Sequence, residues 1–239
     1  MKPPGQTELF EAVDTTWAPL AIHDYHGWLI REGAGGGQRV SSATQILGTP
    51  GATIKAAEKK MASLRQNPLF MIKATDNDLD IELAALGYKI VDPVAILIAR
   101  IDNLQEMKSG QDHRIARLVA PDNNAKSIWA TGGIDHNRLN VMKRVAAPKI
   151  TLSANNKGVA FVVTHDNIAM VHAVEVAKSH RRKGVANALM YEACHWAREM
   201  GCKWISVLTV RQNIPAIKLY KSLEMVEAAA YHYRIKPPE

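Results

Sequence analysis

The chain has 239 residues, is 47% hydrophobic and carries a formal net charge of +7. A chain of this length can bury a sizeable core and can hold two domains. Its apolar run at residues 94–99 is far too short to span a bilayer, and the first residues lack the apolar segment of a secretory signal. We therefore expect a cytoplasmic protein that is not inserted in a membrane.

The cysteine content and the charge further limit the kinds of site and partner that we expect. Only two cysteines occur, Cys194 and Cys202, and their spacing matches neither a metal site nor a redox motif. This predicts a reduced chain without a metal site. The positive charge is not arranged as a basic stripe interleaved with aromatic residues, so no nucleic-acid partner is expected. Attraction to a small polyanionic ligand explains the charge equally well.

The first hundred residues predict alternating strands and helices. After an amphipathic start, two strands at 27–31 and 39–46 flank a glycine-rich turn at 33–37, which favours a hairpin loop. The expected order then continues with helix 54–65, strand 69–73, helix 76–86 ended by Gly87, and extended chain over 88–101 bent at Pro93.

Residues 102–121 are polar and are expected to form a linker. Residues 123–146 predict one or two helices, with a break at Gly132 and Gly133. Three strands follow, at 149–154, 158–164 and 168–176. Turns rich in Asn and Asp separate them, which is typical of hairpins.

The stretch from Val171 to Ala186 is the most informative part of the chain. A β-branched run ends at Val176, and an apolar stripe with helical spacing begins after Gly184. Between them lie Arg181, Arg182 and Lys183. A basic turn that enters a helix forms an anion site, because the first helical amides have no intrahelical partner and the helix dipole adds positive charge. The turn matches neither a P-loop nor a dinucleotide-binding motif.

A second pair of elements follows. Residues 204–210 predict a short buried strand. Asn213 is placed to cap the next helix, and Pro215 suits its first turn. Within that helix Ala216, Leu219, Tyr220 and Leu223 share one face.

The spacing R-x-x-G-x-A at Arg181, Gly184 and Ala186 resembles the acyl-CoA-binding signature of the GCN5-related N-acetyltransferases (GNAT). Residues 213–226 are similar to the second signature of that family, N-x-x-A-x-x-L-Y-x-x-x-G-F. The order of elements matches the family over residues 168–234. Two departures occur: Ala186 replaces the commoner Gly, and Glu224 with Met225 replaces Gly-Phe, which affects how the last helix ends.

The resemblance implies an α/β (α+β) fold of GNAT type, with a mixed, mostly antiparallel central sheet flanked by helices. The elements over residues 27–101 follow the order of the second half of the same fold. Their corresponding loop, residues 47–53, carries no cation. We therefore expect two tandem GNAT-like domains, a degenerate one at residues 1–105 that does not bind CoA and a catalytic one at residues 112–239.

The function that the resemblance implies is acyl-CoA-dependent N-acyl transfer, most simply from acetyl-CoA as co-substrate to a primary amine by direct attack in a ternary complex. The acceptor is expected to be a small-molecule or peptide amine. A non-catalytic acyl-CoA sensor and a partner-binding module acting through the N-terminal half stay open as alternatives. The sequence leaves open the acceptor's identity and whether the chain is a monomer or a homodimer.

The resemblance also implies roles for individual residues. Tyr220 occupies the position of the general acid that protonates the departing CoA thiolate. The backbone of the strand before the basic turn binds pantetheine and the thioester carbonyl. The implied cofactor-binding residues are Val174, Val176, Arg181, Arg182, Lys183, Gly184, Val185, Ala186, Asn187 and Asn213.

The general base has two candidates, His172 and Glu175. Strand alternation predicts that they lie on opposite faces, with His172 on the same face as Val174 and Val176. An imidazole there can take the amine proton directly or through water, so His172 is the candidate base, although a structural role is equally open. The residues expected to line the acceptor pocket are Trp129, Ile134, His136 and Arg138. Each of them, taken singly, is equally explained as an ordinary core or surface residue.

Overall fold

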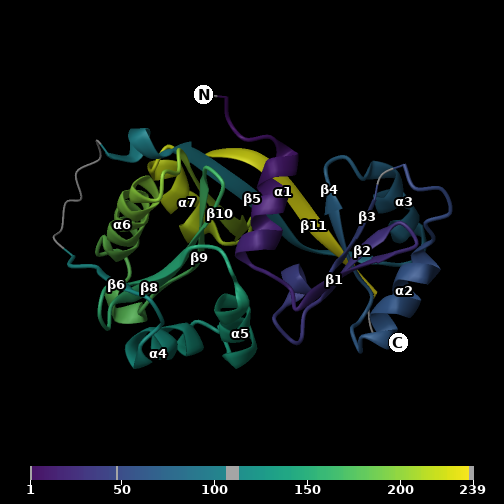
Figure 1. Cartoon of the computed structure of the whole chain (residues 1–239), viewed down its shortest axis with the longest axis horizontal. Coiled ribbons are helices and arrows are strands. Elements are labelled where there is room, and N and C mark those ends of the chain that lie inside the picture. The colour runs from purple at the N-terminus through teal and green to yellow at the C-terminus, as the bar shows by residue number, and fades with distance from the viewer. Residues whose placement is uncertain (1, 47, 106–112, 237–239) are drawn as a thin grey trace.

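The computed structural model describes residues 2–46, 48–105 and 113–236. Its strands form one 11-stranded sheet in the order β1-β2-β3-β4-β11-β5-β10-β9-β8-β7-β6 (Figure 1). Every neighbouring pair is antiparallel except β3–β4 and β9–β10, which are parallel. The predicted fold class, a mixed and mostly antiparallel sheet flanked by helices, is confirmed.

The elements of the N-terminal half are α1 (Gln6–Thr16), β1 (Ala21–Tyr25), β2 (Trp28–Glu32), η1 (Gln38–Val40), β3 (Ala43–Gln45), α2 (Ile54–Ser63), β4 (Leu69–Lys73), α3 (Asn77–Ala85), β5 (Lys89–Arg100) and η2 (Ile101–Gln105). Those of the C-terminal half are β6 (Ala116–Leu118), α4 (Asn123–Thr131), α5 (His136–Arg144), β7 (Lys149–Ser153), β8 (Gly158–His165), β9 (Ile168–Val176), η3 (Lys178–His180), α6 (Val185–Glu199), β10 (Trp204–Val210), α7 (Ile214–Ser222) and β11 (Val226–Ile235).

The sequence prediction differs from these elements in the N-terminal half. Residues 39–46 do not form one strand, because the hydroxyls of Ser41 and Ser42 donate to the carbonyls of Gly37 and Arg39 and hold the chain in a turn before β3. The predicted linker contains η2 and the edge strand β6, while its residues 106–112 lie outside the described residues. The structure also contains the strands β1 and β11, which the sequence prediction does not include.

The two halves share their last strands. The order β3-α2-β4-α3-β5 in the N-terminal half is repeated as β9-α6-β10-α7-β11 in the C-terminal half. In the sheet, β11 lies between β4 and β5, and β5 lies between β11 and β10 (Figure 1). Each half therefore pairs its parallel strands with the final strand of the other half, and the sheet runs through both without a break.

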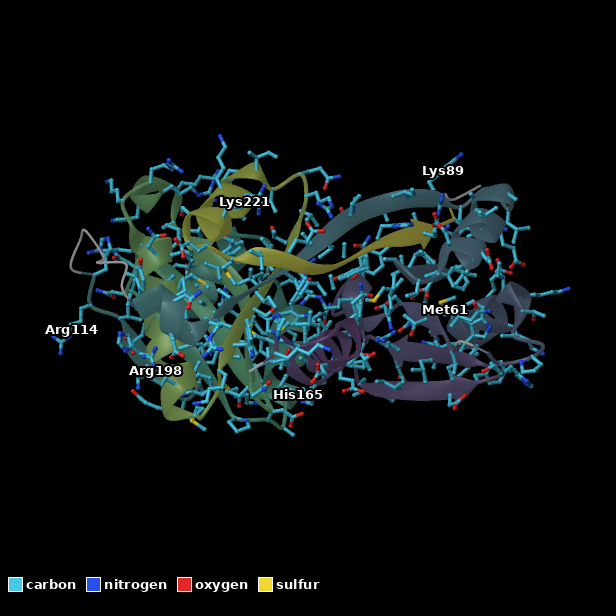
Figure 2. All side chains as sticks on the ribbon, turned by 90° about the horizontal axis from the view of Figure 1, so that it is seen from above. Met61, Lys89, Arg114, His165, Arg198 and Lys221 are labelled. Atoms are coloured by element: carbon cyan, nitrogen blue, oxygen red, sulfur yellow. The ribbon has the colours of Figure 1, made fainter. Side chains whose placement is uncertain are left out.

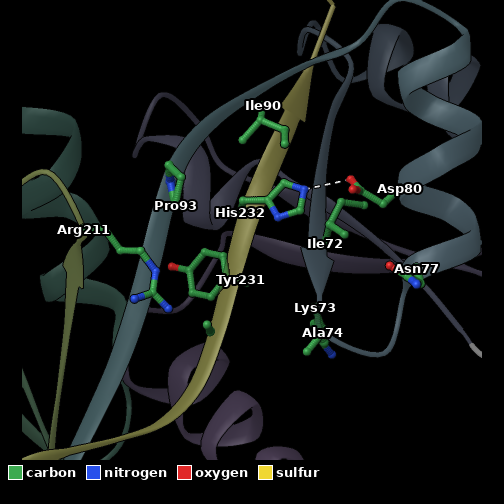
Figure 3. A pocket seen from close by; sticks show the side chains of 11 residues that line it. Ile72, Lys73, Ala74, Asn77, Asp80, Ile90, Pro93, Arg211, Tyr231 and His232 are labelled. Carbon is green, nitrogen blue, oxygen red and sulfur yellow. Dashed lines mark hydrogen bonds and ion pairs between the residues drawn. The ribbon is translucent and has the colours of Figure 1, made fainter.

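Polar contacts fix β11 in the N-terminal half. Arg234 donates through Nε and one terminal nitrogen to the two carboxylate oxygens of Asp80 on α3, at 2.7 and 3.0 Å, and through the other to the carbonyl of Tyr88. His232 lies 2.8 Å from the same carboxylate, beside a cavity of about 320 Å³ over β4, β11 and β5 (Figure 3). Arg234 holds the pKa of Asp80 below its usual range. The ion pair therefore ties the exchanged strand to α3.

Helices cover both faces of the sheet. On one face, α6 and α7 pack on a core that includes Leu189, Ala193 and Ile205. On the other face, α1, α4 and α5 contribute to two cores, one around Trp129 and Phe161 and one around α1. In Figure 2, Met61 lies among the side chains of the N-terminal half, whereas Lys89 and Arg114 extend outward at opposite ends of the molecule. The strands between these layers hold the candidate site.

The end of α7 explains the departure from Gly-Phe. Glu224 has φ 56°, the left-handed conformation that glycine adopts without cost, and the amide of Met225 donates to the carbonyl of Tyr220 as in a Schellman motif. Met225 is buried, where its side chain packs in the α6 core. The chain therefore keeps the geometry of the motif with a strained residue at the glycine position.

Replacing Glu224 by Gly should raise the free energy of unfolding by roughly 0.5–1 kcal/mol, because relief of left-handed strain exceeds the extra backbone entropy of glycine. Lys218→Gly, at an exposed position inside α7, is the control and should lower it by about 1 kcal/mol. Urea unfolding of both variants measures the two shifts. A loss of stability in Glu224→Gly would contradict the assignment of strain.

Candidate functional site

The parallel strands β9 and β10 separate where they approach the basic turn. They pair from Ile168 and Trp204 as far as Val171 and Val207. Both strands continue beyond this point, β9 to Val176 and β10 to Val210, but each is then paired only on its outer side, β9 with β8 and β10 with β5. The facing edge of β9 beyond Val171 is therefore released from the ladder with β10.

A β-bulge lies in β9 at the same point. His172 is opposite Phe161 and Glu175 is opposite Val159, so two residues, Ala173 and Val174, face a single residue of β8. Ala173 has φ 52°, and its carbonyl accepts a hydrogen bond of 2.7 Å from Nε1 of Trp129 on α4. The indole on α4 thus fixes the irregular backbone of the strand.

The bulge overturns the predicted alternation of β9. Val159 and Phe161 both pack in the core around Trp129, so the residues opposite them, His172 and Glu175, lie on that same face. Val174 and Val176 pack on the other face, against the α6 core. The prediction that His172 shares a face with the two valines and that Glu175 opposes it is wrong, because the extra residue reverses the side-chain alternation.

The basic turn follows η3 and leads into α6. The side chains of Arg181, Arg182 and Lys183 are exposed, and Nε of Arg181 donates to the carbonyl of Val176 at 3.2 Å. Arg182 and Gly184 have φ 62° and 80°, which turns the chain sharply at the helix start. Gly184 is the N-cap and supplies no side-chain acceptor to the first turn. The turn therefore presents three cations and uncapped helical amides together, as an anion site requires.

The first residues of α6 differ in burial and in polar contacts. Val185 is buried in the α6 core, whereas Ala186 is partly exposed. The Oδ1 atom of Asn187 is buried and has no hydrogen-bond partner among the described residues. Buried polar atoms are nearly always paired, so this amide oxygen points to a donor that a ligand brings. Asn187 thus places an unsatisfied acceptor in the first turn of α6.

Asn213 and Tyr220 lie at the two ends of α7. Oδ1 of Asn213 accepts from the amide of Ala216 at 3.2 Å, so the predicted N-cap is confirmed and this oxygen serves the helix. Tyr220 is 5% exposed and packs in the α6 core. Burial, with a smaller contribution from the Glu175 carboxylate, raises the pKa of Tyr220. The phenol is therefore protonated at neutral pH, and it lies within electrostatic reach of β9.

Glu175 borders a cavity of about 440 Å³ between α4 and the end of β9. The cavity lining also includes Ile128, Thr131, Gly132 and Arg181. Gly132 approaches so closely that a Cβ there would lie 2.5 Å from Cδ of Glu175. Burial raises the pKa of the Glu175 carboxyl, and Arg181 opposes this effect. The cavity therefore offers a carboxyl group that binds a proton more readily than an exposed glutamate does.

His172 is enclosed by groups from the N-terminal half. Its Nδ1 lies 3.3 Å from a terminal nitrogen of Arg39, and its Nε2 lies 2.9 Å from Oγ1 of Thr16, which is also 2.6 Å from the carbonyl of Ala12. Because a guanidinium only donates, Nδ1 must accept, and Nε2 carries the proton. Burial and the charge of Arg39 hold the pKa of His172 well below its usual value. The lone pair of Nδ1 therefore already accepts a hydrogen bond from Arg39.

The residues predicted to line an acceptor pocket separate into two groups. Trp129 and Ile134 are buried core residues. His136 and Arg138 are exposed on α5, and Arg138 donates to the carbonyl of Gly133 at 2.8 Å. The cavity beside Glu175 is lined instead by Thr131, Gly132 and earlier residues of α4, which the helix break at Gly132 and Gly133 signals in the sequence.

Within residues 2–46, 48–105 and 113–236, no group of three or more His, Cys, Asp or Glu side chains is arranged to hold a metal ion. None of the helices in the same ranges combines the length and apolar character needed to cross a membrane.

Comparisons with known proteins identify the domain. Residues 150–225 match the model of the Acetyltransferase (GNAT) family. A 63-residue stretch is 29% identical to "Uncharacterized N-acetyltransferase YobR" of Bacillus subtilis (strain 168) and covers 26% of each chain. The match therefore spans about a quarter of that curated relative.

Solved structures extend the similarity to the whole fold. A GCN5-related N-acetyltransferase from Kribbella flavida superposes with a TM-score of 0.67 at 14% identity, covering 99% of this chain and 98% of that one. A functionally unknown conserved protein from Staphylococcus epidermidis ATCC 12228 gives 0.68 at 10% identity, covering 92% and 94%. A tandem GNAT protein from the clavulanic acid biosynthesis pathway gives 0.56 at 13% identity, covering 83% and 76%. Residues 150–225 therefore carry the match to the GNAT family, and the solved structures, at 10–14% identity, show that the whole chain shares their fold.

Proposed function

We propose that the chain is an acyl-CoA-dependent N-acyltransferase that transfers the acetyl group of acetyl-CoA to a primary amine. The observation that carries this proposal is the separation of β9 from β10 after Val171, directly before a basic turn that opens α6. An acyl-CoA needs an anion site for its pyrophosphate and free backbone groups for its amide-rich pantetheine arm. Both features occur next to each other on one strand-turn-helix unit.

In the proposed complex, different residues of this unit bind different parts of acetyl-CoA. The uncapped amides from Val185 onward and the cations Arg181, Arg182 and Lys183 hold the pyrophosphate. Gly184 keeps the turn in a left-handed conformation and leaves room for the phosphate. The backbone of Val174 and Val176 binds the pantetheine and orients the thioester carbonyl. Asn187 pairs its unsatisfied Oδ1 with a donor of the ligand.

Glu175 is the proposed general base in place of His172. The lone pair of His172 accepts from Arg39, and protonation would place two cations side by side in a buried position. Glu175 instead lines a cavity, and burial, opposed by Arg181, raises its pKa, which makes the carboxylate a stronger base than an exposed one. In the reaction Glu175 removes one proton from the amine as the amine nitrogen bonds to the acetyl carbon.

Tyr220 is the proposed general acid. The carbon–sulfur bond breaks as the amide bond forms, and the phenol donates its proton to the departing thiolate. The products are the N-acetylated amine and CoA thiol, and the proton on Glu175 returns to Tyr220 through solvent. The electrostatic coupling between the two side chains supports their action in one site.

We propose further that the two halves are tandem copies, with a degenerate domain at residues 1–105 and a catalytic domain at residues 112–239. The repeated element order and the exchanged strands support this division. The described part of the loop before α2, residues 48–53, carries no cation, and Thr53 caps that helix through its own side chain. The chain should therefore bind one CoA.

Calorimetric titration with CoA tests the assignment of the site. The wild-type chain should bind one equivalent of CoA, and Gly184→Glu should abolish binding, because the new side chain adds strain and negative charge at the phosphate position. Gly201→Glu is the matched control: Gly201 has φ 82°, lies after the other end of α6 and has open space around it, so CoA binding should persist.

Wild-type CoA affinity in Gly184→Glu would overturn the placement of the pyrophosphate. A stoichiometry of two would show that the N-terminal half also binds CoA and would overturn its assignment as degenerate. Equal loss of binding in both glycine variants would mean that strain in the fold, and not the anion site, causes the effect.

A further inference from the structure

We propose that Arg39, supplied by the N-terminal half, binds the carboxylate of the acceptor, so that the acceptor is a compact amine that also carries a carboxylate, as an amino acid does. This inference rests on the proposed acyltransferase function and specifies its substrate class. It also gives the N-terminal half, which has no CoA-binding turn, a direct part in the reaction.

Arg39 reaches the point where β9 and β10 separate. It lies in η1, after the glycine-rich turn, and its terminal nitrogen contacts Nδ1 of His172 at 3.3 Å. His172 is the first residue of β9 beyond the last pair with β10. The side chain of an N-terminal residue therefore lies at the base of the proposed acyl site, on the same face of the sheet as Glu175.

The charge of Arg39 has no counter-ion in the described structure. Its polar neighbours are the imidazole of His172 and the hydroxyls of Tyr231 and Tyr233, none of them a carboxylate, and its Nε is buried without a partner among the described residues. Among the described residues, no carboxylate lies within 4.0 Å of its guanidinium, which is always charged. Burying an unpaired cation is costly, so an anionic partner is expected from outside the chain.

A second arginine on the same side of the fold shows the contrast. Arg31 is 3% exposed and forms two hydrogen bonds, of 2.7 and 2.6 Å, with the carboxylate of Asp14. The chain thus neutralises the buried guanidinium of Arg31 with a carboxylate of its own. At Arg39 no carboxylate of the described residues plays this part, so a ligand carboxylate is the counter-ion that the guanidinium lacks.

The surroundings of Arg39 favour a small organic acid over a free phosphate group. Arg39 lies deep in the fold, yet part of its side chain keeps access to solvent. The ring of Trp17 lies 5.7 Å from the guanidinium carbon, and Trp17 also packs against Phe161. These aromatic walls suit the carbon skeleton of an amino acid, while the tyrosine hydroxyls can donate to a carboxylate oxygen.

The strand spacing limits the length of the acceptor. Val174, whose backbone orients the thioester carbonyl in the proposed site, is two residues beyond His172. Two residues of chain span at most about 7 Å, and the bulge at Ala173 shortens this distance. A carboxylate held by Arg39 therefore lies only a few bonds from an amine that attacks the acetyl carbon. This favours compact α- or β-amino acids over long diamines or protein lysines.

Matched acceptor pairs test the inference. The purified full chain is assayed with acetyl-CoA and a panel of amino acids, each compared with its amide and its decarboxylated amine. We expect the wild-type kcat/KM to favour the carboxylate form by roughly 100-fold or more, because a charge-assisted contact to a buried guanidinium is lost in the amide and the amine. Arg39→Met should reduce this preference to within a few-fold of one, and Arg39→Lys should retain only part of it.

Controls separate this inference from the function on which it rests. Acetyl-CoA affinity is measured in each variant as a check on folding and on the CoA site. Arg211→Met, which removes an exposed arginine paired with Glu227, should keep the wild-type preference. Wild-type turnover of amines without any carboxylate preference would overturn the inference and leave the proposed function standing. Failure of the wild-type chain to bind acetyl-CoA would instead refute the proposed function.

Discussion

Replacing Tyr220 by Phe is expected to lower the single-turnover rate of acetyl transfer by roughly 10²–10⁴-fold, with little change in CoA affinity. The substitution keeps the ring in the α6 core and removes only the hydroxyl. The contacts proposed for the pyrophosphate and pantetheine lie on the basic turn and β9. The expected effect therefore falls on the chemical step and not on binding.

Tyr191→Phe is the matched control, since Tyr191 packs against the same core from α6 and has no place in the proposed chemistry. It should leave the rate near the wild-type value. Steady-state turnover alone is insufficient, because slow product release can hide the chemical step. An unchanged single-turnover rate in Tyr220→Phe would remove Tyr220 from the mechanism.

Replacing Glu175 by Gln is expected to lower kcat/KM by roughly 10²–10⁴-fold and to remove the acid limb of the pH–rate profile. A general base must be ionised, so wild-type kcat/KM should rise with pH as Glu175 loses its proton. Burial raises the pKa of this carboxyl, which places the rise above the range of an exposed glutamate. A neutral amide in its place cannot titrate.

Glu227→Gln, at an exposed position on β11, serves as the control and should keep both the rate and the acid limb. His172→Gln discriminates between the two base candidates from β9. If the acid limb survives in Glu175→Gln but disappears in His172→Gln, the histidine is the base and the assignment of Glu175 is wrong.

The proposed acid and base are linked through their charges. Burial is the main cause of the raised pKa of Tyr220, and the Glu175 carboxylate adds a smaller contribution. In the proposed reaction this smaller contribution disappears when Glu175 takes the amine proton.

Much of the C-terminal half could be predicted because its signals are local. The stripe of α6, the cap at Asn213 and the β-branched run of β10 each depend on neighbouring residues, and the structure confirms these elements. The bulge at Ala173 could not be predicted in this way. An alanine gives no sign of a positive φ, and the bond that fixes it comes from Trp129, 44 residues away.

The contribution of the N-terminal half to the site is equally hidden in the sequence. Thr16 and Arg39 meet His172 across 156 and 133 residues of chain, through packing that no local pattern encodes. The same holds for β11, whose neighbours β4 and β5 belong to the other half. Because β11 pairs with strands of the other half, its ten residues depend on partners more than a hundred positions earlier in the chain.

The most direct test of the account is a parallel measurement of CoA thiol release and acetylated product after the full chain is incubated with acetyl-CoA and a panel of amines. We expect one N-acetylated amine for each thiol released, with both signals lost in Gly184→Glu and retained in Gly201→Glu. Tight binding of one acetyl-CoA without transfer to any amine would contradict it, since that is the behaviour of a non-catalytic acyl-CoA sensor.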